Sequence, residues 1–397
     1  MVRGRSRAKR QPIMPISRLD DLADQATCPC LVVKVGSSLL VGHGGVRRAW
    51  LAGLVAELAA ARARGQHIIV VSSGAIALGA ARLRLDKGGR GSLADAQAAA
   101  AVGQIALAGL WAELLAGHRL TAAQILLTLD DLEDRRRYLN VAATLARLRD
   151  AGAVPVINEN DSVATNEIRF GDNDRLAARV AQAAQASAVL LLSDVDGLYD
   201  RDPRQNGAVL LSQVRGVTTD IEAMASGASA SGMGSGGMSA KLQAAAIAER
   251  AGIALAIANG KPDAPISRAL GLGGGGAIGT LFLPRDRGRG KAAARKAWLG
   301  GRLRLRGALT VDAGAAAALE RGSSLLARGV IAVAGGFVRG DAVAIHDADG
   351  RTLAHGLCEY DAGECAALIG LHSSEQAAVL GYAPRSAIVH RDQLVLL

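Results

Sequence analysis

A short apolar run at residues 153–157 is followed at once by a dense cluster of polar side chains. Between residues 158 and 174 there are five acidic residues and four asparagines: Asn158, Glu159, Asn160, Asp161, Asn166, Glu167, Asp172, Asn173 and Asp174. The apolar run predicts a buried strand, and the residues from Arg175 onward have a helical pattern. We therefore expect the cluster at the end of a strand in an open α/β sheet, where such sheets bind ligands. A solvated loop of turn-forming Asn and Asp is the alternative.

Strand and helix patterns alternate along the first 284 residues. Further strands are predicted at 31–35, 67–71, 122–128, 188–192 and 280–283. Further helices are predicted at 46–64, 93–116, 137–150 and 239–250. This alternation predicts the α/β class, with a mostly parallel sheet that is sandwiched between helices.

Lys34 lies near the end of the apolar strand 31–35 and is followed by a Gly-Ser-Ser turn at 36–38. A buried ammonium group is costly unless an anion compensates it. One explanation is a structural salt bridge, and the other is a phosphate held by the lysine and the backbone N–H groups of the turn. A similar Ser-Ser-Gly turn at 72–74 follows the strand 67–71. It fits either an anion site at a helix N-terminus or an ordinary helix cap.

A second lysine stands in a comparable setting. A Gly-, Ser- and Ala-rich stretch at 226–239 leads into the predicted helix 239–250. Lys241 would lie in the first turn of that helix, where a cation opposes the helix dipole. Glycine N–H groups, a helix N-terminus and one lysine together indicate a bound phosphate. A surface lysine after a flexible linker is the alternative.

Two common nucleotide-binding patterns are not supported. The GxGxxG pattern occurs at 232–237 and 274–279, but neither match opens a helix directly after a strand with an acidic residue downstream. With 49 glycines in the chain, such matches are expected by chance. The chain contains no GxxxxGK[ST] loop, which excludes a P-loop NTPase.

The net charge of +10 comes from two stretches. Residues 1–18 carry six basic residues and no acidic one, and residues 284–306 carry nine basic residues and one acidic one. These stretches contribute +6 and +8, so the rest of the chain sums to −4. A basic tail is more often a solubilising arm than a specific nucleic-acid reader. The distribution therefore does not favour RNA as the main partner.

The four cysteines, Cys28, Cys30, Cys358 and Cys365, are too few for a disulfide framework and do not have the spacing of a zinc site. The basic N-terminus is not followed by an apolar segment, so no secretory signal is predicted. The uncharged run 96–112 contains Gln and Gly and is expected to be a buried helix, not a membrane span. These features favour a cytoplasmic location.

Several motifs taken together resemble one family. They are VKVGSS (33–38), SSGAIALG (72–79), VPVINENDSVATNEI (154–168), GDND (171–174), LLLSDVDGLYDRDPR (190–204) and SGGMSAKLQAA (235–245). With them the chain resembles the glutamate 5-kinase group of the amino-acid kinase family. AALERGSSLLARGV (317–330) and GGFVRGD (335–341) resemble a PUA domain. The resemblance implies an amino-acid kinase domain at 31–284 and a small β-rich PUA-like domain at 307–385, with a basic flexible extension at 1–30 and a basic linker at 285–306.

The resemblance implies ATP-dependent phosphorylation of the L-glutamate side-chain carboxylate, the first step of proline biosynthesis. It makes Lys34 and Lys241 catalytic, with Asp174 fixing both ammonium groups. Such a reaction needs no general base, because a carboxylate nucleophile is already ionised near neutral pH. The ATP-binding positions that it implies are Lys34, Ser193, Asp194, Ser235, Gly236, Gly237, Met238, Ser239, Ala240 and Lys241. Mg²⁺ would bridge the ATP phosphates, and no metal site made of side chains is expected.

The resemblance also implies how glutamate is bound. Asp161 would meet the α-ammonium group, and Ser73 and Asn173 would meet the carboxylates. Proline is the expected feedback inhibitor, and a homo-oligomer is expected. Alternatives are another acyl-phosphate-forming kinase, acting on acetylglutamate or aspartate, and an RNA-binding protein that acts through the PUA-like domain. Against the first stand the two motifs NEND and GDND and the PUA-like tail.

Overall fold

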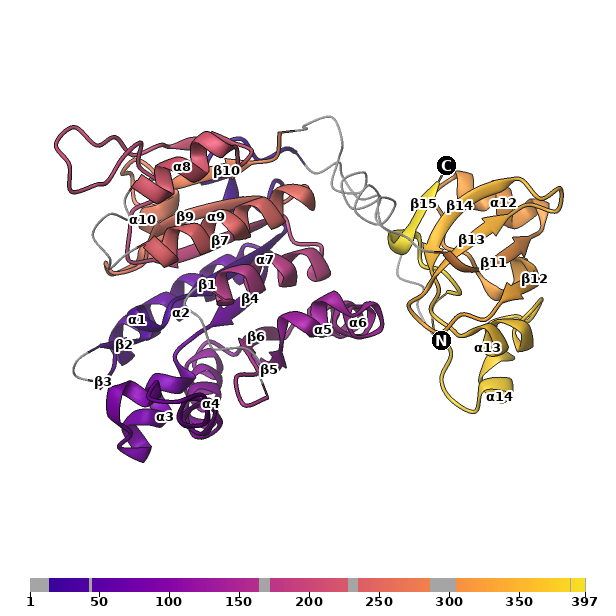
Figure 1. The fold of residues 1–397 in the computed structure, drawn as a ribbon, viewed down its shortest axis with the longest axis horizontal. Helices are drawn as coiled ribbons and strands as arrows, with labels where there is room; N and C mark the ends of the chain where they lie inside the picture. Colours follow the sequence, from indigo (N-terminus) through magenta and orange to yellow (C-terminus); the bar gives the residue numbers. More distant parts are fainter. Residues whose placement is uncertain are drawn as a thin grey trace. The chain divides into compact units, whose positions relative to one another are not determined.

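The computed structural model describes residues 14–42, 45–163, 172–227, 235–285, 305–385 and 387–396. The chain divides into two compact units. The first comprises residues 1–129, 144–249 and 253–285, and the second comprises residues 130–143, 250–252 and 286–397. A large sheet organises the first unit and a smaller sheet the second (Figure 1).

Eight strands form the large sheet: β1 (Cys30–Val35), β4 (His67–Ser72), β5 (Ala122–Leu127), β6 (Val154–Glu159), β7 (Ala188–Ser193), β8 (Gln213–Arg215), β9 (Ala254–Asn259) and β10 (Thr280–Leu283). Their order is β5-β6-β4-β1-β7-β9-β10-β8. The first six strands in this order pair in parallel, and β10 pairs antiparallel with β9. The predicted mostly parallel sheet is confirmed. Its central strand is β1, which carries Lys34.

Helices alternate with these strands: α1 (Ser37–Leu40), α2 (Arg48–Ala63), α3 (Ala75–Leu83), α4 (Leu93–Ala116), α5 (Leu129–Glu133), α6 (Arg135–Asp150), α7 (Asp172–Ala184), α8 (Thr219–Gly227), α9 (Ser235–Arg250) and α10 (Pro265–Leu270). Two 3₁₀ turns, η1 (Asp20–Ala23) and η2 (Asp86–Gly89), and a hairpin of β2 (Val41–Gly42) and β3 (Gly45–Val46) complete this part. The predicted helix 93–116 is confirmed at both ends.

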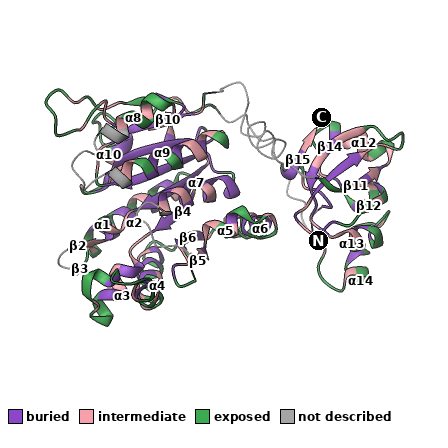
Figure 2. Ribbon diagram, viewed as in Figure 1, coloured by how far each residue is buried: buried purple, intermediate pink, exposed green. Residues whose placement is uncertain are grey.

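The alternation of β1 sends its side chains to two different layers. Leu31 and Val33 belong to a core that also holds Trp50 of α2 and Trp111 of α4. Lys34 faces the other side, where α7 packs against β1, β4 and β7. Figure 2 shows the central strands of the large sheet as buried, and β1, β4 and β7 are buried over nearly their whole length. A lysine at this position can keep its charge only if the facing helix supplies a partner.

Helices α3 and α4 pack through two glycines at very short range. A Cβ added at Gly79 would overlap the carbonyl oxygen of Ala99, and one added at Gly103 would overlap the carbonyl oxygen of Ala75. Among the described residues, α4 is the one helix long and apolar enough to cross a membrane by length and composition. The prediction that it is buried holds only in part, because 39% of its most apolar window is buried and Ile105 is 75% exposed.

The structure corrects the start of two helices. The helix predicted from Arg175 begins at Asp172, so the acidic residues of the GDND motif lie in the first turn of α7 and not in a loop before it. The helix predicted from Ser239 begins at Ser235, so Lys241 lies in the second turn of α9 and not in the first. Both errors have one cause. Gly, Ser, Asn and Asp have low helix propensity, but they are favoured in the first turn, where side chains and ligands satisfy free N–H groups.

Three strand elements were not predicted. Strand β9 is rich in alanine, which is a poor strand former, and burial on both faces overrides that preference. Strand β8 and the hairpin of β2 and β3 have three residues or fewer per strand. Strands this short have no periodicity that a sequence pattern can detect.

The second unit has a five-stranded sheet made of β11 (Leu305–Val311), β12 (Val330–Gly335), β13 (Ala342–His346), β14 (Thr352–Leu357) and β15 (Leu394–Leu396), in the order β12-β11-β13-β14-β15. The helical segments of this unit within residues 305–396 are α12 (Ala313–Glu320), α13 (Ala362–Ala367) and α14 (Gln376–Leu380), with 3₁₀ turns η3 (Ala327–Gly329) and η4 (Arg391–Gln393). Phe337 and Tyr360 are buried in its core. The β-rich prediction is confirmed, although β11 begins inside the predicted linker; residues 286–304 of that linker lie outside the described residues.

Candidate functional site

Two lysines from different elements meet at one carboxylate. Lys34 Nζ, near the end of β1, lies 2.5 Å from Asp174 Oδ1. Lys241 Nζ, in α9, lies 3.1 Å from Asp174 Oδ2 and also donates to the Gly237 carbonyl at 3.3 Å. The structure thus brings together three residues that the sequence analysis named as catalytic. We call them the lysine–aspartate triad.

The triad is nearly closed off from solvent. Each lysine side chain is 10% exposed, and that of Asp174 is 1% exposed. Burial lowers the pKa of Lys34 even though Asp174 acts in the opposite direction. Burial alone would raise the pKa of Asp174, but Lys34 and Lys241 outweigh it and hold that pKa below its ordinary value. With both lysines protonated, two ammonium groups share one carboxylate, and the buried net charge of +1 attracts an anion.

Glycines leave space beside both ammonium groups. A Cβ added at Gly36 would lie 3.8 Å from Lys34 Nζ, and one added at Gly237 would lie 3.9 Å from Lys241 Nζ. Gly36 has φ −70°, which any residue can adopt, so its backbone conformation does not require glycine. Gly237 lies in the first turn of α9, where backbone N–H groups have no acceptor within the helix. First-turn N–H groups and two cations beside small residues suit a phosphate.

A second group of predicted residues lies at the ends of β4 and β6. Asn173 Nδ2 donates to Ser73 Oγ at 2.8 Å and to Asn158 Oδ1 at 3.4 Å. Asn173 is the chain neighbour of Asp174, so α7 serves both groups. Asp161 lies in the turn that follows β6 and is 8% exposed. Asn158 and Asn173 of the polar cluster therefore lie beside Ser73, and their role in binding a ligand stays a prediction.

The loop after β7 is fixed by polar contacts. The Ser193 hydroxyl donates to Asp194 Oδ1 at 3.2 Å, and the Ser193 carbonyl accepts from the N–H of Gly260 at 2.7 Å. Asn259 Nδ2 donates to Asp196 Oδ1 at 3.0 Å. Asn259 and Asp196 were not among the predicted site residues. Asn259 ends β9, and a strand ending in a polar residue was the available signal, but β9 itself had not been predicted.

The remaining predicted ATP-binding residues lie in α9. Gly237, Met238, Ser239 and Ala240 occupy its first two turns, just before Lys241. The backbone of Ser235 and Gly236 is helical, and the side chain of Ser235 lies outside what the structure describes.

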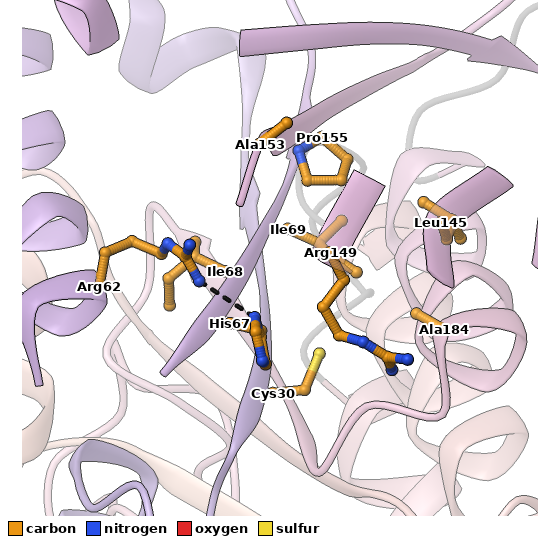
Figure 3. Close-up of a pocket in the computed structure, with 10 residues that line it drawn as sticks. All are labelled: Cys30, Arg62, His67, Ile68, Ile69, Leu145, Arg149, Ala153, Pro155 and Ala184. Carbon is orange, nitrogen blue, oxygen red and sulfur yellow. Dashed lines mark hydrogen bonds between the residues drawn. The ribbon is translucent and has the colours of Figure 1, made fainter. Parts of the chain in front are cut away.

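A pocket at the other end of the central strands is a competing candidate for the functional site (Figure 3). It is lined by Cys30, Arg62, His67, Ile68, Ile69, Leu145, Arg149, Ala153, Pro155 and Ala184. Arg62 Nη1 lies 3.1 Å from His67 Nδ1 and donates to the Gln66 carbonyl at 3.0 Å. Burial and the charges of Arg62 and Arg149 lower the pKa of His67. Cys30 and His67 begin β1 and β4, so this pocket lies at the end of those strands away from the triad.

The sequence of this chain is similar to that of two known domain families and of several known proteins. The profile of the Amino acid kinase family matches residues 29–259, and that of the PUA domain matches residues 307–380. A glutamate 5-kinase from Novosphingobium aromaticivorans is 71% identical over 97% of this chain and 100% of its own length. Glutamate 5-kinases from Sphingopyxis alaskensis and Zymomonas mobilis are 61% and 54% identical, over 94% and 93% of this chain and 98% and 92% of their own lengths. The chain therefore belongs to the amino acid kinase family and carries a C-terminal PUA domain.

Proposed function

We propose that this chain transfers the γ-phosphoryl group of ATP to the side-chain carboxylate of L-glutamate, giving L-glutamyl 5-phosphate, the first step of proline biosynthesis. The observation that carries the proposal is the lysine–aspartate triad, in which two buried ammonium groups share one carboxylate. The names of the similar full-length relatives support the choice of substrate.

The chemistry needs little from the protein beyond position and charge. The glutamate carboxylate is ionised near neutral pH, so it attacks without a general base. Its oxygen forms a bond to the γ-phosphorus while the bond from that phosphorus to the bridging oxygen of ADP breaks. Negative charge spreads over the transferring oxygens and the leaving oxygen. Lys34 and Lys241 neutralise this charge, and Asp174 keeps the two ammonium groups at fixed positions.

ATP and Mg²⁺ have defined roles in this proposal. The first turns of α9 and the Ser193–Asp194 turn hold ATP, with Gly36 and Gly237 leaving room for its phosphates. Bound Mg²⁺ would offset part of the phosphate charge. Among the described residues, no group of three His, Cys, Asp or Glu side chains is placed to hold an ion. The phosphate oxygens of ATP would hold the ion.

On the acceptor side, Asp161 binds the α-ammonium group of glutamate and Ser73 a carboxylate. Proline has the same α-ammonium and α-carboxylate groups but no side-chain carboxylate. We therefore expect proline to occupy the α-group contacts, to leave the phosphoryl site empty and to compete with glutamate. We also propose that the protein forms a homo-oligomer and acts in the cytoplasm.

A coupled assay for ADP release tests the reaction. Glutamate, N-acetylglutamate and aspartate are compared at equal concentration, with hydroxylamine added to trap the acyl phosphate as a hydroxamate. We expect glutamate to be preferred by about 100-fold or more in kcat/KM, because N-acetylglutamate lacks the ammonium charge and aspartate is one methylene shorter, which moves its side-chain carboxylate away from the phosphoryl group. A preference for either other acid would identify a sister kinase instead.

A further inference from the structure

A line of side-chain amides connects α4 to the proposed glutamate site. Asn158 Nδ2 donates to Gln104 Oε1 at 2.8 Å. Asn158 Oδ1 accepts from Asn173 Nδ2 at 3.4 Å, and the same Nδ2 donates to Ser73 Oγ at 2.8 Å. Asn158 is 2% exposed, so water does not compete for its two ends. We call this line from Gln104 through Asn158 to Asn173 the amide relay.

The direction of the relay decides what its far end can offer a ligand. Each amide has one donor end and one acceptor end. Because Gln104 presents an acceptor, Asn158 gives its donor end to Gln104 and its acceptor end to Asn173. Asn173 then uses Nδ2 within the protein. Its Oδ1 is buried and has no hydrogen-bond partner among the described residues. Ser73 Oγ accepts from Asn173, so the Ser73 O–H remains able to donate.

A buried carbonyl oxygen without a donor is unfavourable in the free protein by about 1–3 kcal/mol. Native structures rarely leave such an atom unpaired unless a ligand or water completes it. The relay therefore leaves Asn173 Oδ1 without a hydrogen-bond donor, next to a Ser73 hydroxyl group that can still donate. A zwitterionic amino acid supplies both complements, since its ammonium group donates and its carboxylate accepts.

We propose that Gln104 is a positioning residue that sets the direction of the amide relay and so orients Ser73 and Asn173 for the amino-acid substrate. This rests on the proposed function, because the amino acid concerned is its phosphoryl acceptor. The proposed relay also gives Asn173 a different role from the one expected from the sequence. Asn173 was expected to meet a carboxylate, but its Nδ2 is engaged, and its Oδ1 takes an ammonium hydrogen instead.

The packing of α4 explains why Gln104 is well held. Its neighbour Gly103 packs directly on the backbone carbonyl of Ala75, which fixes the depth of α4 against α3. Two turns further on, Trp111 Nε1 donates to Ser72 Oγ at 2.9 Å in the buried core. The helix is thus anchored on both sides of Gln104, close to the ends of β4 and β6. A side chain on such a rigid support can hold an amide in one orientation.

Three substitutions at Gln104 separate the direction of the relay from its packing. Gln104→Glu keeps an acceptor of the same length. Gln104→Met keeps the length and removes the hydrogen bond. Gln104→Lys presents only donors and would force Asn158 to turn over. Ile105→Met, at the exposed position next to Gln104 on α4, is the control. Each variant is measured for glutamate Kd by calorimetry, KM for glutamate and ATP, and Tm.

We expect glutamate Kd and KM within about threefold of wild type for Gln104→Glu, roughly tenfold higher for Gln104→Met, and higher still for Gln104→Lys. KM for ATP should stay constant in all of them, and the control should match wild type. Equal glutamate binding by the Met variant and wild type, or by the Glu and Met variants, would overturn the proposal. So would better binding by the Lys variant than by the Glu variant, since the relay would then run the other way.

Failure of the relay and failure of the proposed function give different results. If wild-type protein does not phosphorylate glutamate, the function is wrong whatever the variants do. If wild-type protein turns over glutamate and the Met variant does so with the same KM, only the relay is wrong. A Lys variant with a reduced Tm is set aside, and the comparison of the Glu and Met variants decides alone.

Discussion

Lys34 and Lys241 reach the same carboxylate from opposite sides, one oxygen each. Lys34 comes from the central strand and Lys241 from a helix far along the chain, and Asp174 from a third element lies between them. This arrangement suits a phosphoryl group with negative charge, and it is unfavourable when no anion is present. The triad should therefore contribute to catalysis at the expense of stability.

Removing one lysine tests that trade-off. Lys34→Met leaves Asp174 paired with Lys241 and removes the excess buried charge. We expect kcat to fall by roughly 100-fold or more, because charge on the transferring phosphate loses a partner. Tm should stay the same or rise, because the buried ion cluster becomes neutral. Kinetics at saturating glutamate and a thermal melt measure both. A clear fall in Tm together with unchanged kcat would contradict this view of the triad.

Removing the carboxylate should have the opposite effect on stability. Asp174→Asn keeps the size of the side chain but removes the carboxylate that the two buried ammonium groups share. We expect a loss of about 3–5 kcal/mol in the free energy of unfolding, together with a large fall in kcat. Denaturant titration measures the first. If phosphate is added, it should restore part of the lost stability by supplying the missing anion.

Asp161 should act on glutamate and not on ATP. Asp161→Asn keeps the shape of the side chain and removes the charge that we assign to the α-ammonium group. We expect KM for glutamate to rise steeply while KM for ATP stays near normal. Proline inhibition should weaken in parallel, because proline has the same ammonium group. An effect on ATP alone would place Asp161 in the other subsite.

Much of this site was predictable because its residues stand where strand patterns end. Lys34 lies near the end of an apolar run and Ser73 and Ser193 follow such runs, and parallel strands bring these ends to one edge of the sheet. Position along a helix was harder to predict. The residues around Asp174 and Lys241 have poor helix propensity, so both helices were predicted to begin too late in the sequence. A first turn made of Gly, Ser, Asn and Asp has the composition of a loop.

Gln104 could not have been predicted from local sequence. It lies in the middle of a long Ala-rich helix, where a glutamine reads as an ordinary polar interruption. Its contact to Asn158 depends on how closely α4 approaches the sheet, and that distance is set by tertiary packing through Gly103. Strand β9 was missed for a related reason, since burial between neighbouring strands overrides the low strand preference of alanine.

His67 should make the protein less stable in weak acid. Burial lowers its pKa below the ordinary value of 6.5, and Arg62 adds to that effect. The unfolded chain therefore binds a proton more readily than the folded one. The stability that His67 contributes is present above about pH 6.5 and is lost as the pH falls from there toward the lowered folded pKa. His67→Gln should flatten the free energy of unfolding across this window. Denaturant titration of wild type and His67→Gln at several pH values across this window measures the slope.

The close crossing of α3 and α4 gives the sharpest stability test, because α4 carries two glycines in contrasting surroundings. A Cβ at Gly103 would overlap the Ala75 carbonyl oxygen, whereas one at Gly109 would meet nothing within 4 Å. Gly109→Ala should therefore stabilise the protein by about 0.5–1 kcal/mol, the ordinary gain from replacing a helix glycine. Gly103→Ala gains the same propensity but must push the helices apart. We expect a net loss of about 1–3 kcal/mol or more, as in other overpacked cores.

The same displacement should reach the proposed glutamate site. Gln104 follows Gly103 directly, so a shift of α4 would lengthen its hydrogen bond to Asn158. Gly103→Ala should raise KM for glutamate, and Gly109→Ala should not. Denaturant titration and steady-state kinetics on the two variants measure both effects with one substitution type on one helix. Equal stability of the two variants would show that α4 can move away from α3 without cost, and the rigid support assigned to Gln104 would then be absent.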